Sequence, residues 1–521
     1  MKSRDRHPDS LPGGSHTRGE PTSEARHWRA NPHLYQLNTW AWLDELSDAA
    51  GRRLTLADVP DAEWDRIGDL GFDFVYLLGL WQRSVAGRHL FRTDATSFGV
   101  FDRVAPQWTI SSVVGSPFSI SDYAPDSRIG TWAEVDAVRA KLRERDIKLI
   151  LDFVPNHTGP DHGWIRSHPD YFVRGTEEDY HRDPSAFLLI EPEDAPPCFV
   201  ARGRDPCFAP WADTAQVDFF NVEARNALVE TLRAIARHCD GLRCDMAMLV
   251  LNEVFGKTWA GLLRGRPAPP TEFWPQAIAA LPADFLWMAE VYWDMEGVLQ
   301  QLGFSYTYDK RLYDRLHGAS PREVRAHLAA PLSHQQRMAR FLENHDEPRS
   351  VTTFGRHRLP GLAALLCTLP GLRFFHQGQF EGRSIHLPMP LNAASPEAPD
   401  RELEETYVKL LGIADDAIFH DGEWKLLDVA PDNDATHENL VAYRWRGAGG
   451  MRVVVVNLAD VTSHGRVVIA NDLDPDGRLV FTDLLDGCAY RRDRQALADH
   501  GLYIRLDGHR AHIFSVAPDS A

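Results

Sequence analysis

Several carboxylate side chains follow directly after apolar runs of the chain, a position where an acid is costly to bury. Arg243 and Asp245 are two residues apart and therefore lie on one side of a predicted strand. Glu290 follows the run FLWMA, and Asp152 and Asp346 end two further runs. An ionised carboxylate at such a position is stable only with a cationic or hydrogen-bonding partner, or is retained because it takes part in a reaction. One such residue could be structural, but a set on separate strands predicts a reactive site with paired carboxyl groups.

Most of these residues also have a structural interpretation when each is taken alone. Arg243 with Asp245 could be an ion pair that caps the sheet, and His157 and His345 could be hydrogen-bonded structural histidines. His157 with His162 could bind a metal, but no third ligand stands at a matching spacing, so we predict no metal site. The structural interpretations lose force when the residues are taken together, because they recur at the ends of successive strands.

The elements that must position these residues alternate between short β-rich runs and helical stretches from about residue 34. This order is typical of βα units in a parallel sheet. The helix before the third strand carries a predicted capping box, Thr131 with Glu134. We therefore predict an α/β fold, a (β/α)8 TIM barrel whose site lies at the C-terminal ends of its strands. The eight predicted strands are residues 34–40, 73–81, 147–154, 241–247, 284–292, 304–309, 338–346 and 372–378.

Three segments differ in composition from the barrel, which we assign to residues 31–157 and 216–420. Residues 158–215 are rich in Pro, Asp, Gly and aromatics with little periodicity, which predicts a small, loop-rich domain inserted after the third strand. Residues 421–521 contain β-rich runs between turns and no helices, which predicts a C-terminal antiparallel β-sandwich domain. Residues 1–30 are polar and rich in Gly, Pro and Ser, so we expect a disordered tail.

Charge and hydropathy exclude several classes of partner. The net charge of −18 argues against nucleic-acid binding, because phosphate contacts need clustered Lys and Arg. No apolar run reaches membrane-spanning length, and the first residues lack the apolar stretch of a signal peptide. We therefore expect a cytoplasmic protein that binds neither nucleic acid nor a membrane, and the sequence contains no signal for its oligomeric state.

The six cysteines are too few and too scattered to hold together a fold of 521 residues. Cys239, Cys244 and Cys367 stand in apolar runs and are predicted to be buried thiols. Cys198 and Cys207 could form a disulfide, and this alternative stays open at the level of sequence.

At the residues that end the predicted strands, the sequence resembles the α-amylase family, glycoside hydrolase family 13. The resemblance extends over about residues 33–380, and its motifs occur in the order that the family has. Any one motif alone would be weak, whereas four strand motifs in register are highly specific. The matching segments are SPFSISDY (116–123), LDFVPNH (151–157), QVDFFN (216–221), GLRCDMA (241–247), MAEVYW (288–293) and FLENHDEPR (341–349).

The resemblance implies a role for each site residue. Asp245 would be the nucleophile, Glu290 the acid/base and Asp346 the carboxylate that stabilises positive charge in the transition state. Arg243 would keep Asp245 ionised, while Glu290 would hold its proton to higher pH. The substrate-binding residues would be Arg243, His157, His345 and Phe118.

The implied activity is that of a retaining glycoside hydrolase, which cleaves α-glucosidic bonds of small α-glucosides or malto-oligosaccharides by double displacement. A transglycosylase or isomerase that transfers glucose to a sugar acceptor would use the same three carboxylates. A non-catalytic carbohydrate-binding barrel is a third hypothesis, although such relatives usually lose one carboxylate. The chemistry requires no cofactor.

The sequence departs from the family pattern in three places, one of which is Gly378-Gln379-Phe380-Glu381 after the eighth strand, where the family often has Gly-Gln-Glu. Many starch-degrading members have Lys-His where this chain has Met248 and Leu249, which weakens the expectation of an endo-acting amylase. Phe118 replaces the usual tyrosine of the aromatic platform, so a hydroxyl is lost. Asn156 and Asp218 match positions that help to bind calcium in many members, but the other ligands are not recognisable. Calcium is therefore possible and not predicted.

Overall fold

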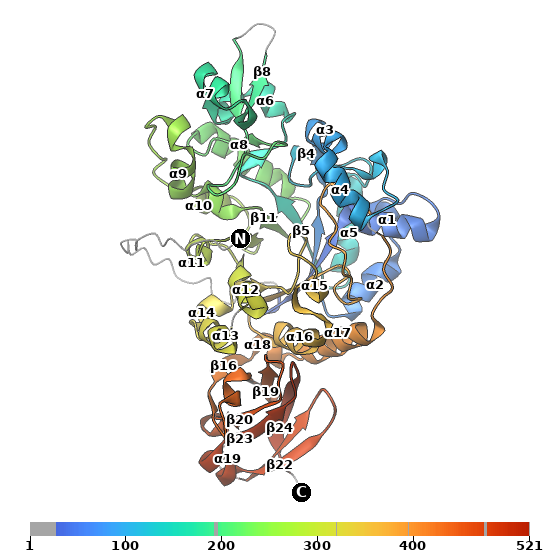
Figure 1. Cartoon of the computed structure of the whole chain (residues 1–521), viewed down its shortest axis with the longest axis vertical. Helices are drawn as coiled ribbons and strands as arrows, with labels where there is room; N and C mark the ends of the chain where they lie inside the picture. Colours follow the sequence, from blue (N-terminus) through green and yellow to red (C-terminus); the bar gives the residue numbers. More distant parts are fainter. Residues whose placement is uncertain (1–27, 192–195, 319, 394, 474–476, 520–521) are drawn as a thin grey trace.

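A computed structural model of the chain describes residues 28–191, 196–318, 320–393, 395–473 and 477–519. Its three parts follow one another along the long axis of the molecule, with the inserted segment at one end, the barrel in the middle and the C-terminal sheets at the other end (Figure 1). The predicted disordered tail lies outside the described residues as far as residue 27.

A closed, parallel, eight-stranded barrel forms the middle part, as the sequence predicts. Its strands follow one another around the barrel in chain order, and β1 pairs with β15 to close it. Each strand overlaps one of the eight predicted runs, although the ends differ. The strands are β1 (His33–Asn38), β2 (Phe74–Leu78), β5 (Lys148–Phe153), β11 (Gly241–Cys244), β12 (Leu286–Ala289), β13 (Tyr306–Tyr308), β14 (Met338–Arg340) and β15 (Leu372–His376).

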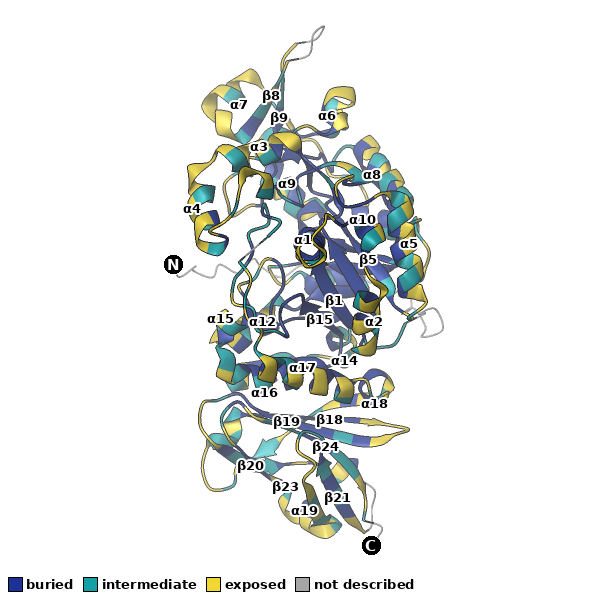
Figure 2. Cartoon of the chain, turned by 90° about the vertical axis from the view of Figure 1, so that its right-hand side faces the viewer, coloured by how far each residue is buried: buried dark blue, intermediate teal, exposed yellow. Residues whose placement is uncertain are grey.

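Helices cover the outside of the barrel and shield its strands from water, so the strands are buried on both faces (Figure 2). The covering helices up to β12 are α1 (Thr39–Ala50), α2 (Asp61–Asp69), α3 (Val85–Thr93), α4 (Ala95–Val104), α5 (Trp132–Arg143), α8 (Val222–Ile235), α9 (Asn252–Leu263) and α10 (Phe273–Ala279). Those after β12 are α11 (Glu296–Gln301), α12 (Lys310–Gly318), α13 (Pro321–Leu328), α14 (Leu332–Gln335), α15 (Ser350–Phe354), α16 (Leu359–Thr368), α17 (Arg401–Ala414) and α18 (Ile418–Asp421).

The predicted capping box of α5 is only half formed. Thr131 accepts a hydrogen bond from the backbone N–H of Glu134, as a cap should. The Glu134 carboxylate instead accepts a hydrogen bond from the Thr55 hydroxyl at 2.7 Å. The reciprocal half of the prediction is therefore wrong, because a residue 79 positions away competes for the glutamate.

A two-stranded antiparallel ladder joins the ends of the inserted segment, where β6 (His157–Thr158) pairs with β10 (Ala215–Gln216). This ladder returns the chain to the barrel next to the point where it left. Between the two strands lies a three-stranded sheet of order β7-β9-β8. The elements of the insertion are α6 (Gly163–Ser167), β7 (Arg174–Gly175), α7 (Glu177–Arg182), β8 (Phe187–Ile190) and β9 (Cys198–Ala201).

The C-terminal part consists of two antiparallel sheets with a common apolar core. The six-stranded sheet is buried on both faces at β18, where Leu440 and Ala442 face the smaller sheet while Tyr443 and Trp445 pack on the barrel. Figure 2 shows this sheet directly beneath α16 and α17. The strands are β16 (Glu423–Leu427), β17 (Val429–Ala430), β18 (Leu440–Gly447), β19 (Gly450–Asn457), β20 (Ser463–Val467), β21 (Arg478–Asp483), β22 (Ala489–Asp493), β23 (Leu502–Leu506) and β24 (Ala511–Pro518).

The expectation of no helix in this part is wrong, because α19 (Arg494–His500) lies between β22 and β23. Asp493 caps its first turn through backbone N–H groups.

All six cysteines are described and are free thiols, so the alternative of a Cys198–Cys207 disulfide is excluded. Cys239, Cys244 and Cys367 are buried, as predicted. Among the helices of the described residues, none combines the length and the apolar character needed to cross a membrane.

Candidate active site

The register between β11 and β12 brings the first two candidate carboxylates together. Cys244 and Ala289 are paired across these strands, and Asp245 and Glu290 are the next residues of each. The backbone N–H of Glu290 donates to the Cys244 carbonyl, which continues the ladder. Both side chains therefore leave neighbouring strands at the C-terminal end of the barrel, where the loops of such barrels form their sites.

The Arg243 guanidinium group is the centre of the site. Its side chain is fully buried and lies 2.7 Å from Asp245 (Nη1 to Oδ1) and 2.9 Å from Glu290 (Nη2 to Oε2). The third carboxylate, Asp346, comes within 3.7 Å of the same Nη2 atom. One cation thus faces three acids, which compensates part of their mutual repulsion but not all of it.

Asp346 also pairs with its neighbour His345, whose Nε2 lies 2.9 Å from Asp346 Oδ2. The other ring nitrogen of His345 hydrogen-bonds to the side-chain amide of Gln36 from β1 at 2.8 Å. This contact fixes the orientation of the imidazole from across the barrel. Asp346 is the most open of the three acids, with a side chain that is 36% exposed, against 8% for Asp245 and 5% for Glu290.

Two hydrogen bonds hold the Glu290 carboxyl group in place. The backbone N–H of Met246 donates to Oε2 at 2.7 Å, and the Tyr292 hydroxyl donates to Oε1 at 2.8 Å. Met246 adopts a left-handed conformation (φ 41°, ψ 47°), which is uncommon for a residue other than glycine. This local strain lies immediately after Asp245 and turns the N–H group toward Glu290.

The three acids differ in pKa. Burial and the charges of Asp245 and Asp346 raise the pKa of Glu290 to about 7, although Arg243 opposes them. Burial also raises the pKa of Asp245, and it outweighs the lowering effect that we expected from Arg243. Burial acts on Asp346 too, but His345 and Arg243 outweigh it and lower its pKa to about 2. At neutral pH Asp346 is therefore ionised, whereas Glu290 is divided between its protonated and its ionised form.

A pocket of about 330 Å³ opens above the three acids, and the inserted segment forms part of its wall. Phe118 lies with its ring 5.3 Å from the Arg243 guanidinium carbon and 5.5 Å from the His345 ring. His157 stands beside Trp211 of the insertion, with ring centroids 5.2 Å apart. Burial lowers the pKa of His157 to about 4, so its ring is neutral and available as a hydrogen-bond partner.

All seven site residues predicted from the sequence therefore gather around one pocket or its Arg243 centre. Two other carboxylates at strand ends do not. Asp152 accepts hydrogen bonds from the Tyr76 hydroxyl and the Gly79 N–H, and Glu343 is held by Arg349 and the Ser350 N–H. Asp152 and Glu343 are therefore structural: their hydrogen bonds hold parts of the barrel together, which is the role that each candidate acid could have had when taken alone.

Sequence reasoning missed three residues of the site. Tyr292 stands two positions after Glu290, the spacing that places strand residues on one side, so a signal existed. Tyr308 ends β13 and places its ring centroid 5.7 Å from the Arg243 guanidinium carbon, and an aromatic residue at a strand end could have been noticed. The left-handed conformation of Met246 has no signal in the sequence.

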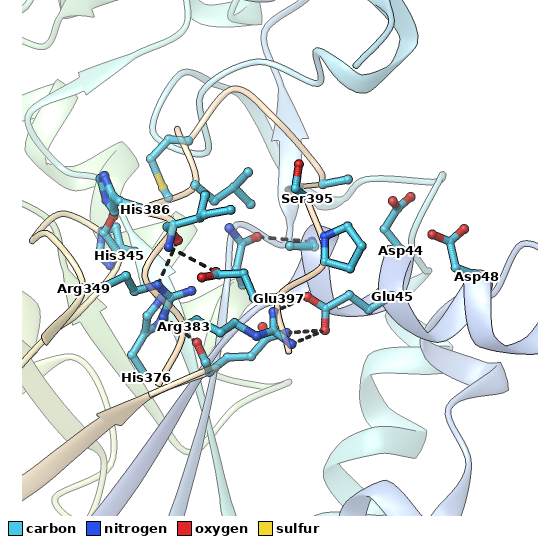
Figure 3. A pocket seen from close by; sticks show the side chains of 18 residues that line it. Asp44, Glu45, Asp48, His345, Arg349, His376, Arg383, His386, Ser395 and Glu397 are labelled. Atoms are coloured by element: carbon cyan, nitrogen blue, oxygen red, sulfur yellow. Dashed lines mark hydrogen bonds and ion pairs between the residues drawn. The ribbon is translucent and has the colours of Figure 1, made fainter. Parts of the chain in front are cut away.

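A second pocket lies behind His345, between α1 and the loop that follows β15 (Figure 3). The loop is tied to α1 through Arg383 and Glu45, whose Nη2 and Oε2 atoms are 3.0 Å apart. From the same loop, His386 Nε2 donates to the backbone carbonyl of His345 at 2.8 Å. The loop therefore supports the segment that carries Asp346, and its role was not predicted.

The side chains that the resemblance associates with calcium are engaged by protein donors. Asp218 forms an ion pair with Arg266 and accepts the Phe220 N–H at 2.9 Å. The side-chain Oδ1 of Asn156 accepts a hydrogen bond from the Gln216 side-chain amide at 3.0 Å. A cation at this place would have to displace Arg266 and compete with these donors, so this pair of residues does not fit a calcium site.

The fold and the site together define a class. They describe a (β/α)8 barrel whose strand ends present a pair of carboxyl groups of unequal pKa beside a third, the arrangement of enzymes that act on glycosidic bonds. Comparison with known proteins agrees: the alpha-amylase catalytic domain matches residues 105–254. This segment of the chain is thus similar to the alpha-amylase catalytic domain, and curated relatives named as alpha-amylases share a similar sequence over about half of the chain or more.

The relatives are distant. The alpha-amylase MalA of Haloarcula japonica is 26% identical over 271 residues, which cover 51% of this chain and 36% of that protein. Alpha-amylase 3 of Dictyoglomus thermophilum is 22% identical over 347 residues, or 61% of each chain. The chain thus spans between a third and two thirds of the length of these relatives. The crystal structure of the noncanonic maltogenic alpha-amylase AmyB from Thermotoga neapolitana superimposes with a TM-score of 0.66 at 21% identity, over 93% of this chain and 98% of that one.

Proposed function

We propose that the protein is a retaining glycosidase, which hydrolyses α-glucosidic bonds of small α-glucosides or malto-oligosaccharides by double displacement. The observation that supports this most strongly is the convergence of Asp245, Glu290 and Asp346 on the one buried guanidinium group of Arg243. No structural need explains three acids around a single cation, because their desolvation exceeds what one arginine compensates.

In the first step, the Asp245 oxygen that Arg243 does not hold attacks the anomeric carbon. The bond to the glycosidic oxygen breaks, and that oxygen takes the proton of Glu290. A glycosyl ester of Asp245 results. In the second step the ionised Glu290 removes a proton from water, the resulting oxygen attacks the same carbon, and the bond to Asp245 breaks.

The raised pKa of Glu290, about 7, suits this exchange, because an acid that must also act as a base works best near the working pH. Asp346 is ionised at every pH at which the protein would work, since its pKa lies near 2. Its charge would stabilise the positive charge that develops on the sugar ring. His157 and His345 would hydrogen-bond the sugar, and Phe118 would cover its C–H face.

The contacts that both acids make with one guanidinium group support the proposal of retention. Retaining enzymes hold their carboxyl groups about 5–5.5 Å apart, whereas inverting enzymes need about 6.5–9.5 Å to admit a water molecule between acid and sugar. Here the two terminal nitrogens of one guanidinium group contact both acids, at 2.7 and 2.9 Å. This arrangement favours the shorter separation.

The substrate is proposed to be small. Met248 and Leu249, which replace the Lys-His pair of many starch-degrading members, are buried and cannot contact a leaving sugar. Trp211 and Asp213 of the insertion close one side of the pocket. A panel of maltose, maltotriose, trehalose, sucrose, isomaltose and soluble starch, with products separated by chromatography, would test this; turnover of starch alone would contradict it.

A second candidate, transfer of glucose to a sugar acceptor, is favoured by a neighbouring pocket. Met246 lines both pockets, and beyond it stand Tyr292, Trp293 and Phe208. Trp293 and Phe208 are 42% and 73% exposed, and sugars stack on such aromatic faces. If an acceptor binds there, Trp293→Ala lowers the ratio of transfer to hydrolysis, while Tyr503→Ala in the C-terminal domain does not.

The experiment that tests the role of Asp245 is the Asp245→Asn substitution. Turnover should fall by about 10⁴-fold or more, since the nucleophile is lost, while circular dichroism and the melting temperature stay near those of the wild type. Asp161→Asn provides a matched control at an acid outside the pocket, and it should keep normal turnover. Full activity of the Asp245→Asn variant would reject the assignment of Asp245 as the nucleophile.

A further inference from the structure

Three potential metal ligands meet where the barrel touches the C-terminal domain, outside the candidate active site. His357 lies in the single turn η7 (Arg356–Arg358) before α16, Asp460 follows β19, and His509 lies between β23 and β24. One ligand atom from each residue lies within 4.8 Å of the other two. We propose that these three residues bind a divalent transition-metal ion of the zinc type, which links the barrel to the C-terminal domain.

The distances suit such an ion after a small adjustment. Asp460 Oδ1 lies 3.7 Å from His357 Nε2 and 2.5 Å from His509 Nε2. Donors at about 2.0–2.1 Å around a tetrahedral zinc ion are about 3.4 Å from one another. The longer contact therefore already fits, and the shorter one is a hydrogen bond that the metal would replace. The Asp460 side chain is 80% exposed and free to make this shift.

His509 is the fixed ligand of the three. It is 4% exposed, and its φ of 55° lies in the left-handed region, where a residue other than glycine needs support from its surroundings. That support comes from α16, because a Cβ atom at Gly361 would approach the His509 carbonyl oxygen to 2.8 Å. Only a glycine at position 361 permits this close approach. The contact fixes the position of His509 relative to α16 and thus to the turn before it, which contains His357. A preorganised ligand lowers the entropy that binding must overcome.

The chemistry of the donor atoms also suits a metal. Nitrogen and oxygen ligands from two histidines and one carboxylate favour zinc and its neighbours over calcium or magnesium. Arg358 opposes binding, because its positive charge lies close to His509.

The test uses the full chain after removal of metal with EDTA. Zn²⁺ is titrated in competition with a chromophoric chelator, and Co²⁺ is titrated to obtain the visible absorption of a tetrahedral site. The wild type should bind one more ion than His357→Ala, or bind it at least about tenfold more tightly, since loss of even an outer-shell partner has that effect. His464→Ala is the matched control, because His464 lies 3.2 Å from Asp434 in the C-terminal domain, outside the cluster of three potential ligands.

Zn²⁺ should also raise the melting temperature of the wild type and not that of Asp460→Asn. Both His357 and Asp460 are exposed, with side chains 68% and 80% accessible, so neither substitution should prevent folding. Equal affinity and stoichiometry in the wild type and in His357→Ala would overturn the proposal. It would equally be overturned if His464→Ala weakened binding as much as His357→Ala did.

Discussion

Substitution of Glu290 by Gln should stabilise the protein at alkaline pH while it abolishes activity. The pKa of Glu290 is about 7 in the folded protein and near its ordinary value of 4.5 in the unfolded chain. Since each pKa unit corresponds to about 1.4 kcal/mol, ionisation of this buried group costs the folded state about 3 kcal/mol above pH 7. A neutral glutamine avoids this cost. Its oxygen can still accept from Met246, and its amide can donate to the Tyr292 hydroxyl.

The sign of the effect follows from the direction of the shift. A raised pKa gives stability that is fully present below pH 4.5 and lost as the pH rises through 7. Glu290→Gln and wild type should therefore have similar stability at pH 4.5, and the variant should be the more stable at pH 8. Thermal and urea unfolding across this range would measure the difference. Asp346→Asn is the contrasting control, because its pKa is lowered and its loss should destabilise near neutral pH. A Glu290→Gln variant less stable than wild type at pH 8 would refute the reasoning.

Three further predictions follow. The pH dependence of kcat/KM should be bell-shaped, with an alkaline limb near pH 7 from Glu290 and an acid limb from the raised pKa of Asp245; a value of kcat/KM that does not fall as the pH rises above 7 would contradict this assignment. Met246→Val should lower stability by about 1–2 kcal/mol and reduce kcat, because a β-branched residue resists the left-handed conformation that aims the N–H at Glu290, whereas Met246→Gly should keep both near normal. EDTA should leave the turnover rate unchanged, since Arg266 occupies Asp218, and a loss restored by calcium would overturn this expectation.

The barrel could be predicted from the sequence because its strands are short apolar runs between helices of clear periodicity. The residues at which the strands begin and end could not be predicted. The seventh predicted strand covers residues 338–346, but β14 ends at Arg340. Residues 341–346 leave the ladder so that Asp346 can reach the pocket, and residues 341–345 remain buried, so hydropathy alone does not distinguish them from strand residues.

The candidate acids could be found because each stands at the end of an apolar run. What distinguishes Asp245 and Glu290 from the structural acids Asp152 and Glu343 is the set of partners that each one meets in space. Asp245 and Glu290 both form ion pairs with one arginine, Arg243. Asp152 instead accepts hydrogen bonds from a tyrosine and a backbone N–H group, and Glu343 pairs with a different arginine. These partners lie on other strands, so the spacing of residues along the chain does not predict them.

Two features depended on conformation rather than composition. The strain at Met246 arises because the backbone must turn sharply after Asp245, and methionine itself has no preference for that conformation. Helix α19 is short and polar, so its periodicity is weak, but Asp493 before it is a helix-capping residue that could have been recognised.

The most direct test of the central claim is to trap the covalent intermediate. The protein is incubated with a fluorinated α-glucoside that forms the glycosyl enzyme quickly and loses it slowly, and the labelled peptide is identified by mass spectrometry. We predict one sugar per chain, attached to the Asp245 carboxylate, and no label in Asp245→Asn. A label on another residue would contradict the account, as would a protein that turns over α-glucosides without ever acquiring the label.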